Sequence, residues 1–180
     1  MPITNVAGGE TLLIEKWLRG DESALQSLIG RYQKLIFNLV LYLGRCDHDT
    51  AYQITASIFA QGIGLLTEKG NDGDLLKKII RIAAEKCRAL PSEFSFDTSD
   101  FAAFSPAKKA QLSVAKEALF RISFEHRLSL LLRDQMNLPY AMIAETLALN
   151  EAAVRANVVQ ARIQLGDKLQ EILKRARGES

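Results

Sequence analysis

Apolar residues recur at spacings of three and four along most of the chain, which is the pattern of helices with one buried face. The clearest example lies within residues 31–43, and its apolar positions are Leu35, Ile36, Leu39, Val40 and Leu43. Short polar stretches rich in Gly, Asn and Asp separate the periodic segments and mark turns. No segment shows the two-residue alternation of a half-buried strand. The sequence therefore predicts an all-α fold.

The first half of the chain contains four periodic segments. They predict a helical block over 10–28 that restarts after Asp21, and further helices over 31–43, 50–67 and 74–89. Asp21 and Asp74 precede two of these starts, where an aspartate oxygen can accept hydrogen bonds from the free amides of the first turn. Gly62 and Gly64 interrupt the third helix, and we expect its later part to bend or fray.

The character of the chain changes after residue 90. Residues 91–107 lack a helical period, carry several turn formers and are predicted to be a linker. Periodicity resumes beyond it and predicts helices over 108–119, 125–134, 140–147 and 151–175, the last of them capped by Asn150. We therefore expect two small helical domains, 1–90 and 108–180, joined by the linker.

Composition is ordinary for a globular protein, with 48% hydrophobic and 24% charged residues among 180. The two cysteines, Cys46 and Cys87, show no disulfide or metal spacing and suggest reduced thiols in the cytoplasm. No apolar stretch reaches the 20 or so residues that span a bilayer, so we expect no membrane association. His48 and His126 lack neighbours at metal-ligand spacing. No nucleophile or phosphate-loop motif is visible, and we expect no enzyme, metal or cofactor.

The segment from residue 139 to 165 has the spacing of a helix-turn-helix. Tyr140, Ile143, Ala144 and Leu147 precede a three-residue turn, and Val154 is the fourth residue of the next helix. A small residue such as alanine allows two short helices to cross closely. The apolar contact between the helices is expected to comprise Ile143, Leu147, Leu149, Val154 and Val158. The outer face of the second helix would then be free to enter a major groove.

Residues 118–169 resemble the C-terminal domain, region 4, of extracytoplasmic-function sigma factors. The resemblance implies DNA contacts from the second helix, by Asn150, Glu151, Ala152, Arg155, Ala156, Asn157, Gln160 and Arg162. The segment departs from the family where basic residues are replaced by Asn157 and Gln160, although both amides suit adenine edges. Net charge is only +2, so phosphate contacts would depend on a local basic face.

The resemblance extends to the first half of the chain. Gly20 and Asp21, followed by Ala24, Leu28 and Tyr32, match the opening of sigma region 2. In the next family motif, acids and a Gln clasp a coiled coil on the largest polymerase subunit. The aligned residues implied here for polymerase binding are Asp49, Tyr52, Gln53 and Ala56. Two acids and an amide of the family are thus replaced, which removes charge-assisted hydrogen bonds.

A basic cluster follows on the helix predicted over 74–89. In the family this helix touches the promoter near the point of melting, and the resemblance implies DNA contacts from Lys77, Lys78, Arg81 and Arg88. Lys77, Arg81 and Arg88 are spaced by four and seven and would share one face. Glu85 stands where the family has Asn.

These features favour a sigma-like transcription initiation protein that binds core RNA polymerase and promoter DNA, with an anti-sigma factor as a further partner by analogy. Two alternatives remain open at this point. The chain could be a sigma-like interaction protein that binds an anti-sigma factor or another protein without promoting initiation. It could also be a regulator that binds DNA through its helix-turn-helix alone.

Overall fold

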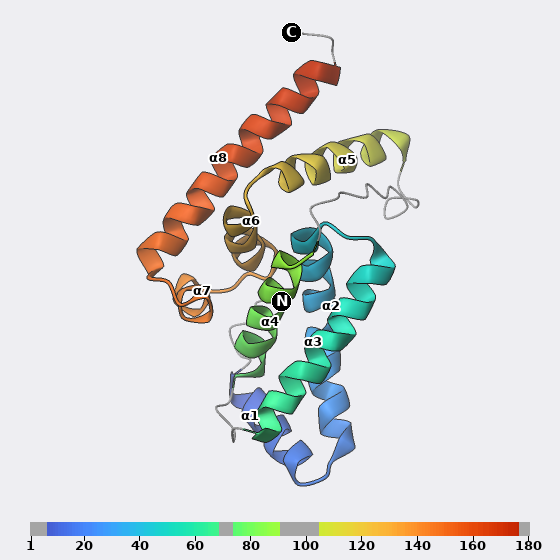
Figure 1. Ribbon diagram of the computed structural model, residues 1–180, viewed down its shortest axis with the longest axis vertical. Helices are drawn as coiled ribbons and strands as arrows, with labels where there is room; N and C mark the ends of the chain where they lie inside the picture. The colour runs from blue at the N-terminus through green and yellow to red at the C-terminus, as the bar shows by residue number, and fades with distance from the viewer. Residues whose placement is uncertain (1–6, 69–73, 91–104, 177–180) are drawn as a thin grey trace.

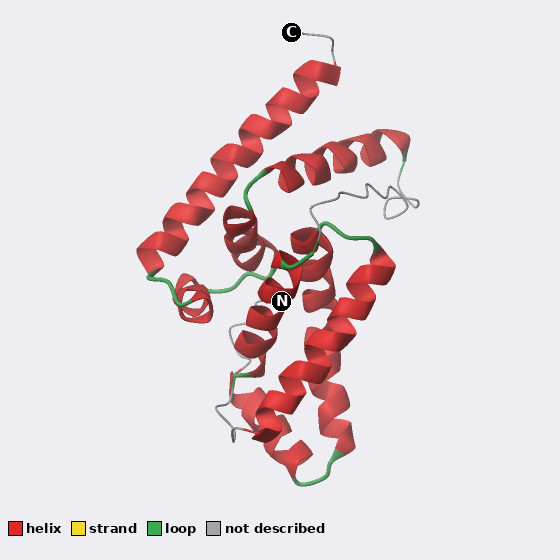
Figure 2. Cartoon of the chain, viewed as in Figure 1, coloured by secondary structure: helices red, strands yellow, loops and turns green. Residues whose placement is uncertain are grey.

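The computed structural model describes residues 7–68, 74–90 and 105–176, and the elements in these ranges are helices (Figures 1 and 2). The predicted all-α fold is confirmed. The elements are α1 (Ala7–Leu18), α2 (Glu22–Gly44), α3 (His48–Glu68), α4 (Leu75–Arg88), α5 (Pro106–Arg121), α6 (Phe124–Leu130), the π-helix η2 (Leu131–Gln135), α7 (Tyr140–Leu147) and α8 (Glu151–Ala176). Within these ranges, no helix is long and apolar enough to cross a membrane.

Three helices begin at the polar residues that the sequence indicated. The carboxylate of Asp21 accepts from the amide of Ser23 at 3.0 Å, at the start of α2. Asp74 accepts from the amide of Lys77 at 3.2 Å, at the start of α4. The side-chain oxygen of Asn150 accepts from an amide in the first turn of α8 at 2.7 Å. Each cap satisfies a backbone donor that the helix itself cannot pair.

The predicted break between residues 28 and 31 is wrong, because α2 runs unbroken from Glu22 to Gly44. Leu28, Tyr32 and Ile36 are all fully buried, so one continuous face packs against the other helices of the first half. This packing outweighs the weak helix propensity of Gly30. The helix ends at Arg45, which adopts the left-handed conformation with φ 56°.

The later part of α3 does not fray as expected, since α3 continues as one helix through Gly62 and Gly64 to Glu68. A Cβ atom at Gly62 would lie 2.5 Å from Cγ2 of Ile79 on α4. Glycine at this position therefore allows α3 and α4 to approach closely. Around Gly64 there is open space within 4 Å.

The two halves of the chain share one hydrophobic core. Buried residues of α4, such as Leu76 and Ile80, belong to the same cluster as Leu132, Ile143 and Val154 of the second half. Figure 1 shows α4 at the centre, α6 and α7 beside it, and α8 extending away toward the C-terminus. The linker predicted over 91–107 falls mostly on residues 91–104, which lie outside the described residues, and its last two residues begin α5.

A buried carboxylate joins three helices of the first half. Glu10 on α1 is 3% exposed, and its Oε1 accepts from the amide of Leu75 at the start of α4, at 2.6 Å. The hydroxyl of Tyr32 on α2 donates to the other oxygen of Glu10. Burial raises the pKa of Glu10, although these two hydrogen bonds act in the opposite direction. The network fixes the start of α4 against α1 and α2.

Candidate nucleic-acid and protein-binding surfaces

The exposed start of α8 is the first candidate surface. Among its predicted DNA-contacting residues, Asn150, Glu151, Ala152, Arg155, Ala156, Gln160 and Arg162 are exposed and Asn157 is half-buried. The opposite face of α8 is anchored by Val154, Val158 and Ala161, which are fully buried. The structure therefore brings the predicted residues together on the solvent side of one helix. Their DNA contacts remain a prediction.

The helices α7 and α8 pack through Ile143, Ala144 and Val154, which are buried as expected. The prediction that Leu149 belongs to this apolar contact is wrong, because Leu149 is 42% exposed. It follows Ala148, whose left-handed conformation at φ 54° ends α7 and turns the chain outward. The turn geometry, rather than the apolar character of the residue, decides where Leu149 points.

The two arginines of this surface are held in different ways. Arg155 lies over the ring of Tyr140, with 4.2 Å from its guanidinium carbon to the ring centroid, and also pairs with Glu151 at 3.2 Å. Arg162 makes two hydrogen bonds to Asp134, at 2.7 and 3.2 Å. A bidentate pair to a carboxylate engages the groups that would bind a phosphate. Arg155 is therefore the better placed of the two for DNA.

The basic residues of α4 face the second half of the chain. Lys77 lies 2.6 Å from a carboxylate oxygen of Glu145 on α7, and also pairs with Asp74. Arg81 donates to the carbonyl oxygens of Thr146 at 2.7 Å and Glu145 at 2.9 Å. The predicted shared face of these side chains is thus present, and α7 lies against it. Lys78, also predicted to contact DNA, is half-buried.

The last basic residue of α4 contacts α6. Arg88 pairs with Glu125 at 2.7 Å, and its guanidinium lies over the ring of Phe124 at 4.8 Å from the centroid. Contacts with the second half therefore run from the first turn of α4 to its last turn. The predicted DNA-facing side of α4 is engaged within the protein.

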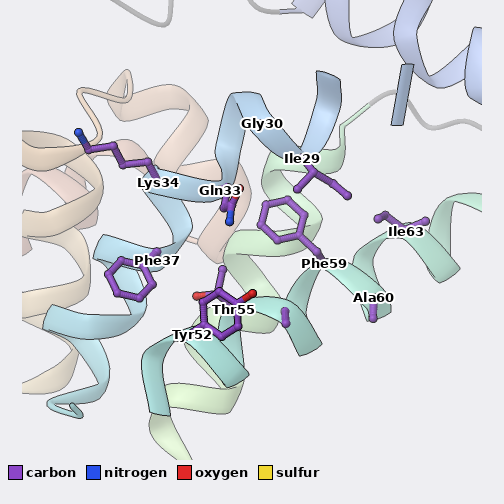
Figure 3. A pocket seen from close by; sticks show the side chains of 11 residues that line it. Ile29, Gly30, Gln33, Lys34, Phe37, Tyr52, Thr55, Phe59, Ala60 and Ile63 are labelled. Carbon is purple, nitrogen blue, oxygen red and sulfur yellow. The ribbon is translucent and has the colours of Figure 1, made fainter. Parts of the chain in front are cut away.

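The residues predicted to bind polymerase lie on the exposed face of α3. Asp49, Tyr52, Gln53 and Ala56 are all exposed, and the Tyr52 side chain is the most exposed large apolar group, at 64%, in the described part of the chain. Tyr52 and Ala56 line a groove between α2 and α3 with a volume of about 570 Å³ (Figure 3). Asp49 and Gln53 are outside its lining.

The groove is lined mainly by apolar groups. Phe37 and Tyr52 lie toward one end, and Ile29 and Ile63 lie toward the other (Figure 3). Its remaining lining residues are Gly30, Gln33, Lys34, Thr55, Ala56, Phe59 and Ala60. The hydroxyl of Thr55 is buried in the wall without a hydrogen-bond partner. A groove with this lining suits an apolar group that also carries a hydrogen-bonding atom.

The fold is similar to that of CnrH. The solved structure of CnrH in complex with the cytosolic domain of CnrY has a TM-score of 0.73 with this chain, at 18% sequence identity. The match covers 91% of this chain and 98% of that chain. CnrH is an extracytoplasmic-function sigma factor and CnrY is an anti-sigma protein. No family model matches the sequence, and no curated protein matches it significantly.

The comparison with CnrH supports the fold that the sequence resemblance implied. Sequence reasoning nevertheless missed the α2 side of the groove, where Ile29, Gln33 and Phe37 lie. These positions follow a spacing of four, so they share a face of α2 separate from the buried face that carries Leu28, Tyr32 and Ile36. A second stripe with apolar residues on one helix is the signal that could have revealed the groove.

The described residues contain no group of three or more His, Cys, Asp or Glu side chains that could hold a metal ion.

The two thiols of the chain, those of Cys46 and Cys87, lie near one another. Cys46 and Cys87 both point toward the carbonyl oxygen of Val40, with Sγ at 3.8 and 4.0 Å. Burial raises the pKa of Cys46 to about 11 and that of Cys87 to about 12. At neutral pH both are protonated, and a protonated thiol is a weak nucleophile.

Proposed function

We propose that this protein is a sigma-like transcription initiation protein that binds core RNA polymerase and promoter DNA. The observation that carries the proposal is the pairing of two exposed surfaces in one sigma-like fold: the start of α8 and the α3 face beside the groove. Residues 1–90 would act as the region 2-like module and residues 108–180 as the region 4-like module, with the linker 91–107 between them.

The start of α8 would bind the upstream promoter element in the major groove, with α7 and α8 forming the helix-turn-helix. Asn150 both caps the helix and stands at its tip, and Arg155 and Gln160 follow on the exposed side. Glutamine and asparagine can bond adenine edges, while arginine contacts guanine or phosphate. Tyr140 beneath the Arg155 guanidinium limits its freedom and thereby lowers the entropy lost on binding.

The α3 face would bind the polymerase. At 1.5 Å of rise per residue, the groove-lining residues span about 12 Å of α2 and about 16 Å of α3. This length suits two or three turns of a partner helix. Tyr52 supplies a large exposed apolar surface in place of a family carboxylate. We therefore expect polymerase binding here to depend more on apolar burial than on charge pairs, and to be less sensitive to salt.

A second candidate function is a sigma-like interaction protein. Two observations favour it: the groove lining contains Lys34 but no acid, and the basic side of α4 is engaged by the second half. A partner that inserts an apolar helix would fit the groove without any role in initiation. The CnrH structure was solved with the cytosolic domain of CnrY bound, and a related partner for this chain would be an anti-sigma protein.

Capture of purified core polymerase by this protein, with run-off transcription in the same mixture, separates the two functions. An initiation protein binds core and yields a discrete transcript, whereas an interaction protein yields none. Tyr52→Ala should weaken capture at least several-fold, because it removes the largest exposed apolar group beside the groove. Gln61→Ala, on the exposed side of α3 but outside the groove lining, is the matched control.

DNA binding is tested separately on α8. Arg155→Ala should weaken binding to promoter fragments and lower the salt dependence by about one unit of slope. Arg175→Ala, at the other end of the same helix, removes the same charge and should leave both unchanged. Equal effects from the two substitutions would mean that α8 contributes only general charge.

A further inference from the structure

Two thiols from distant parts of the chain meet where α2 and α4 both end. Cys46 lies in the turn after α2, and Cys87 lies in the last turn of α4. A Cβ atom on Gly44 would lie 3.3 Å from the sulfur of Cys87 and 3.5 Å from the sulfur of Cys46. The absence of a side chain at Gly44 therefore leaves room for both sulfur atoms beside the same backbone position.

A buried cation accompanies this pair of thiols. Arg127 on α6 is 4% exposed, and it donates to the carbonyl oxygen of Leu43, the residue before Gly44. Its Nε is buried without a hydrogen-bond partner among the described residues. Burial and the like charge of Arg45 lower the pKa of Arg127, and its interaction with Cys87 raises it. Negative charge on the thiols would therefore stabilise the buried guanidinium.

We propose that Cys46 and Cys87 form a binding site for a monovalent soft metal cation, Cu(I) or Ag(I), with the guanidinium of Arg127 as its counter-charge. Such cations prefer thiolate ligands, and two thiolates in a linear arrangement complete their coordination. Two metal–sulfur bonds of about 2.3 Å each would join the two sulfur atoms, and their shared position beside Gly44 allows this. The inference does not depend on the proposed function.

Charge favours a monovalent cation over a divalent one. Binding displaces one proton from each thiol, so two thiolates and a monovalent cation together carry one negative charge. The guanidinium of Arg127 neutralises this charge, and Arg45 nearby also favours an anionic complex. A zinc ion with the same two thiolates would leave the positive charge of Arg127 uncompensated. Zinc also needs four ligands, and the described residues contain no group of three His, Cys, Asp or Glu that could supply them.

The half-buried Cys46 gives the site a route from solvent, whereas Cys87 is only 5% exposed. A free thiolate is not required beforehand, because the incoming cation drives the proton from the thiol. Spacing along the chain shows no sign of this site. Metal motifs that are visible in a sequence place ligands a few residues apart, but these thiols are brought together only by the packing of α2 against α4.

The test titrates the full reduced chain with Cu(I), without oxygen, in competition with the chromophoric chelator bathocuproine disulfonate. We expect one Cu(I) per chain and, by X-ray absorption at the copper edge, two sulfur neighbours and no third ligand. Cys46→Ser and Cys87→Ser should each lower the affinity by roughly 100-fold or more, because each removes one of the two ligands. Cys46 is half-buried, so its variant tests the site even if Cys87→Ser folds poorly.

The matched control is Cys46→Ser combined with Ser27→Cys, which keeps two thiols in the chain but moves one to an exposed position on α2. Cu(I) should raise the melting temperature of the wild type and not that of the control. Equally tight binding by the control would show that any cysteine of the chain holds the cation, and this would overturn the proposal. A single sulfur neighbour, a third ligand at copper, or equal stabilisation of the wild type by Zn²⁺ would each overturn it as well.

Discussion

Arg127 on α6 donates a hydrogen bond to the carbonyl oxygen of Leu43, at the end of α2, over 3.1 Å. The same guanidinium donates to the carbonyl oxygens of Phe120 at 3.4 Å and Ile122 at 3.1 Å. Its side chain is 4% exposed, and burial lowers its pKa to about 10, so it remains charged at neutral pH. This arginine ties the second half of the chain to the end of α2.

Replacing Arg127 with Met should lower the free energy of unfolding by about 3–5 kcal/mol, because buried carbonyl groups lose their donors. Urea denaturation measures the change. Arg121→Met is the control, since Arg121 pairs with Glu117 at the surface and should contribute at most about 1 kcal/mol. A loss at Arg127 no larger than that at Arg121 would contradict the assignment of a structural role to the buried guanidinium.

Two glycines of α3 should respond in opposite directions to alanine. Gly62→Ala should destabilise by about 1–3 kcal/mol, since its Cβ would overlap Ile79 on α4. Gly64→Ala should stabilise by roughly 0.5–1 kcal/mol, because it adds helix propensity in open space. Thermal unfolding of both variants checks this. Destabilisation of equal size at both positions would mean that the α3–α4 approach is looser than described.

Glu10 should give the protein an unusual response to mild acid. Its pKa is raised, so the folded protein binds the proton more readily than the unfolded chain. Protonation of Glu10 therefore increases the free energy of unfolding as pH falls through the raised pKa to below 4.5. The increase is about 1.4 kcal/mol for each unit by which the pKa of Glu10 is raised. Glu10→Gln removes this gain. Acids with a lowered pKa, such as Asp21 and Asp47, decrease the free energy of unfolding as pH falls, and they do so equally in the wild type and in Glu10→Gln.

The measurement that isolates Glu10 is the difference in unfolding free energy between wild type and Glu10→Gln, followed from pH 7 to pH 4. The difference should shift in favour of the wild type as pH falls. A constant difference across this range would show that the Glu10 carboxyl titrates alike in the folded and unfolded protein.

The two thiols should react slowly in the folded protein. With pKa values of about 11 for Cys46 and about 12 for Cys87, only a very small fraction of either is thiolate at pH 8. A disulfide reagent such as DTNB should label Cys46 roughly ten times faster than Cys87, and both should react rapidly in urea. Rapid labelling of Cys87 before unfolding would show that the core around it opens readily.

The features predicted well from the sequence are those set by neighbouring residues. Asp21, Asp74 and Asn150 each cap the helix that they were expected to begin, because a cap needs only the next two or three amides. The predicted helix over residues 140–147 has the same bounds as α7. These agreements reflect short-range hydrogen bonding, which the order of residues specifies directly.

The features that were missed depend on segments far apart in the chain. Gly62 looked like a weak point in α3, but the proximity of Ile79 gives it a packing role. The helix expected over 125–134 ends as α-helix at Leu130 and continues as the π-helix η2, so its apolar positions do not follow a single period. The groove between α2 and α3 needs both helices in place before it exists. Which residues contact DNA or polymerase remains a prediction.

The continuous core described above has a consequence for how the chain denatures. Because Ile80 of α4 and Ile143 of α7 belong to one apolar cluster, the two halves are expected to melt together in a single calorimetric transition. A core substitution in either half should lower the melting temperature of the whole molecule. Compensating substitutions on opposite sides of the cluster should then restore it, so core positions of the two halves are expected to co-vary in sequence.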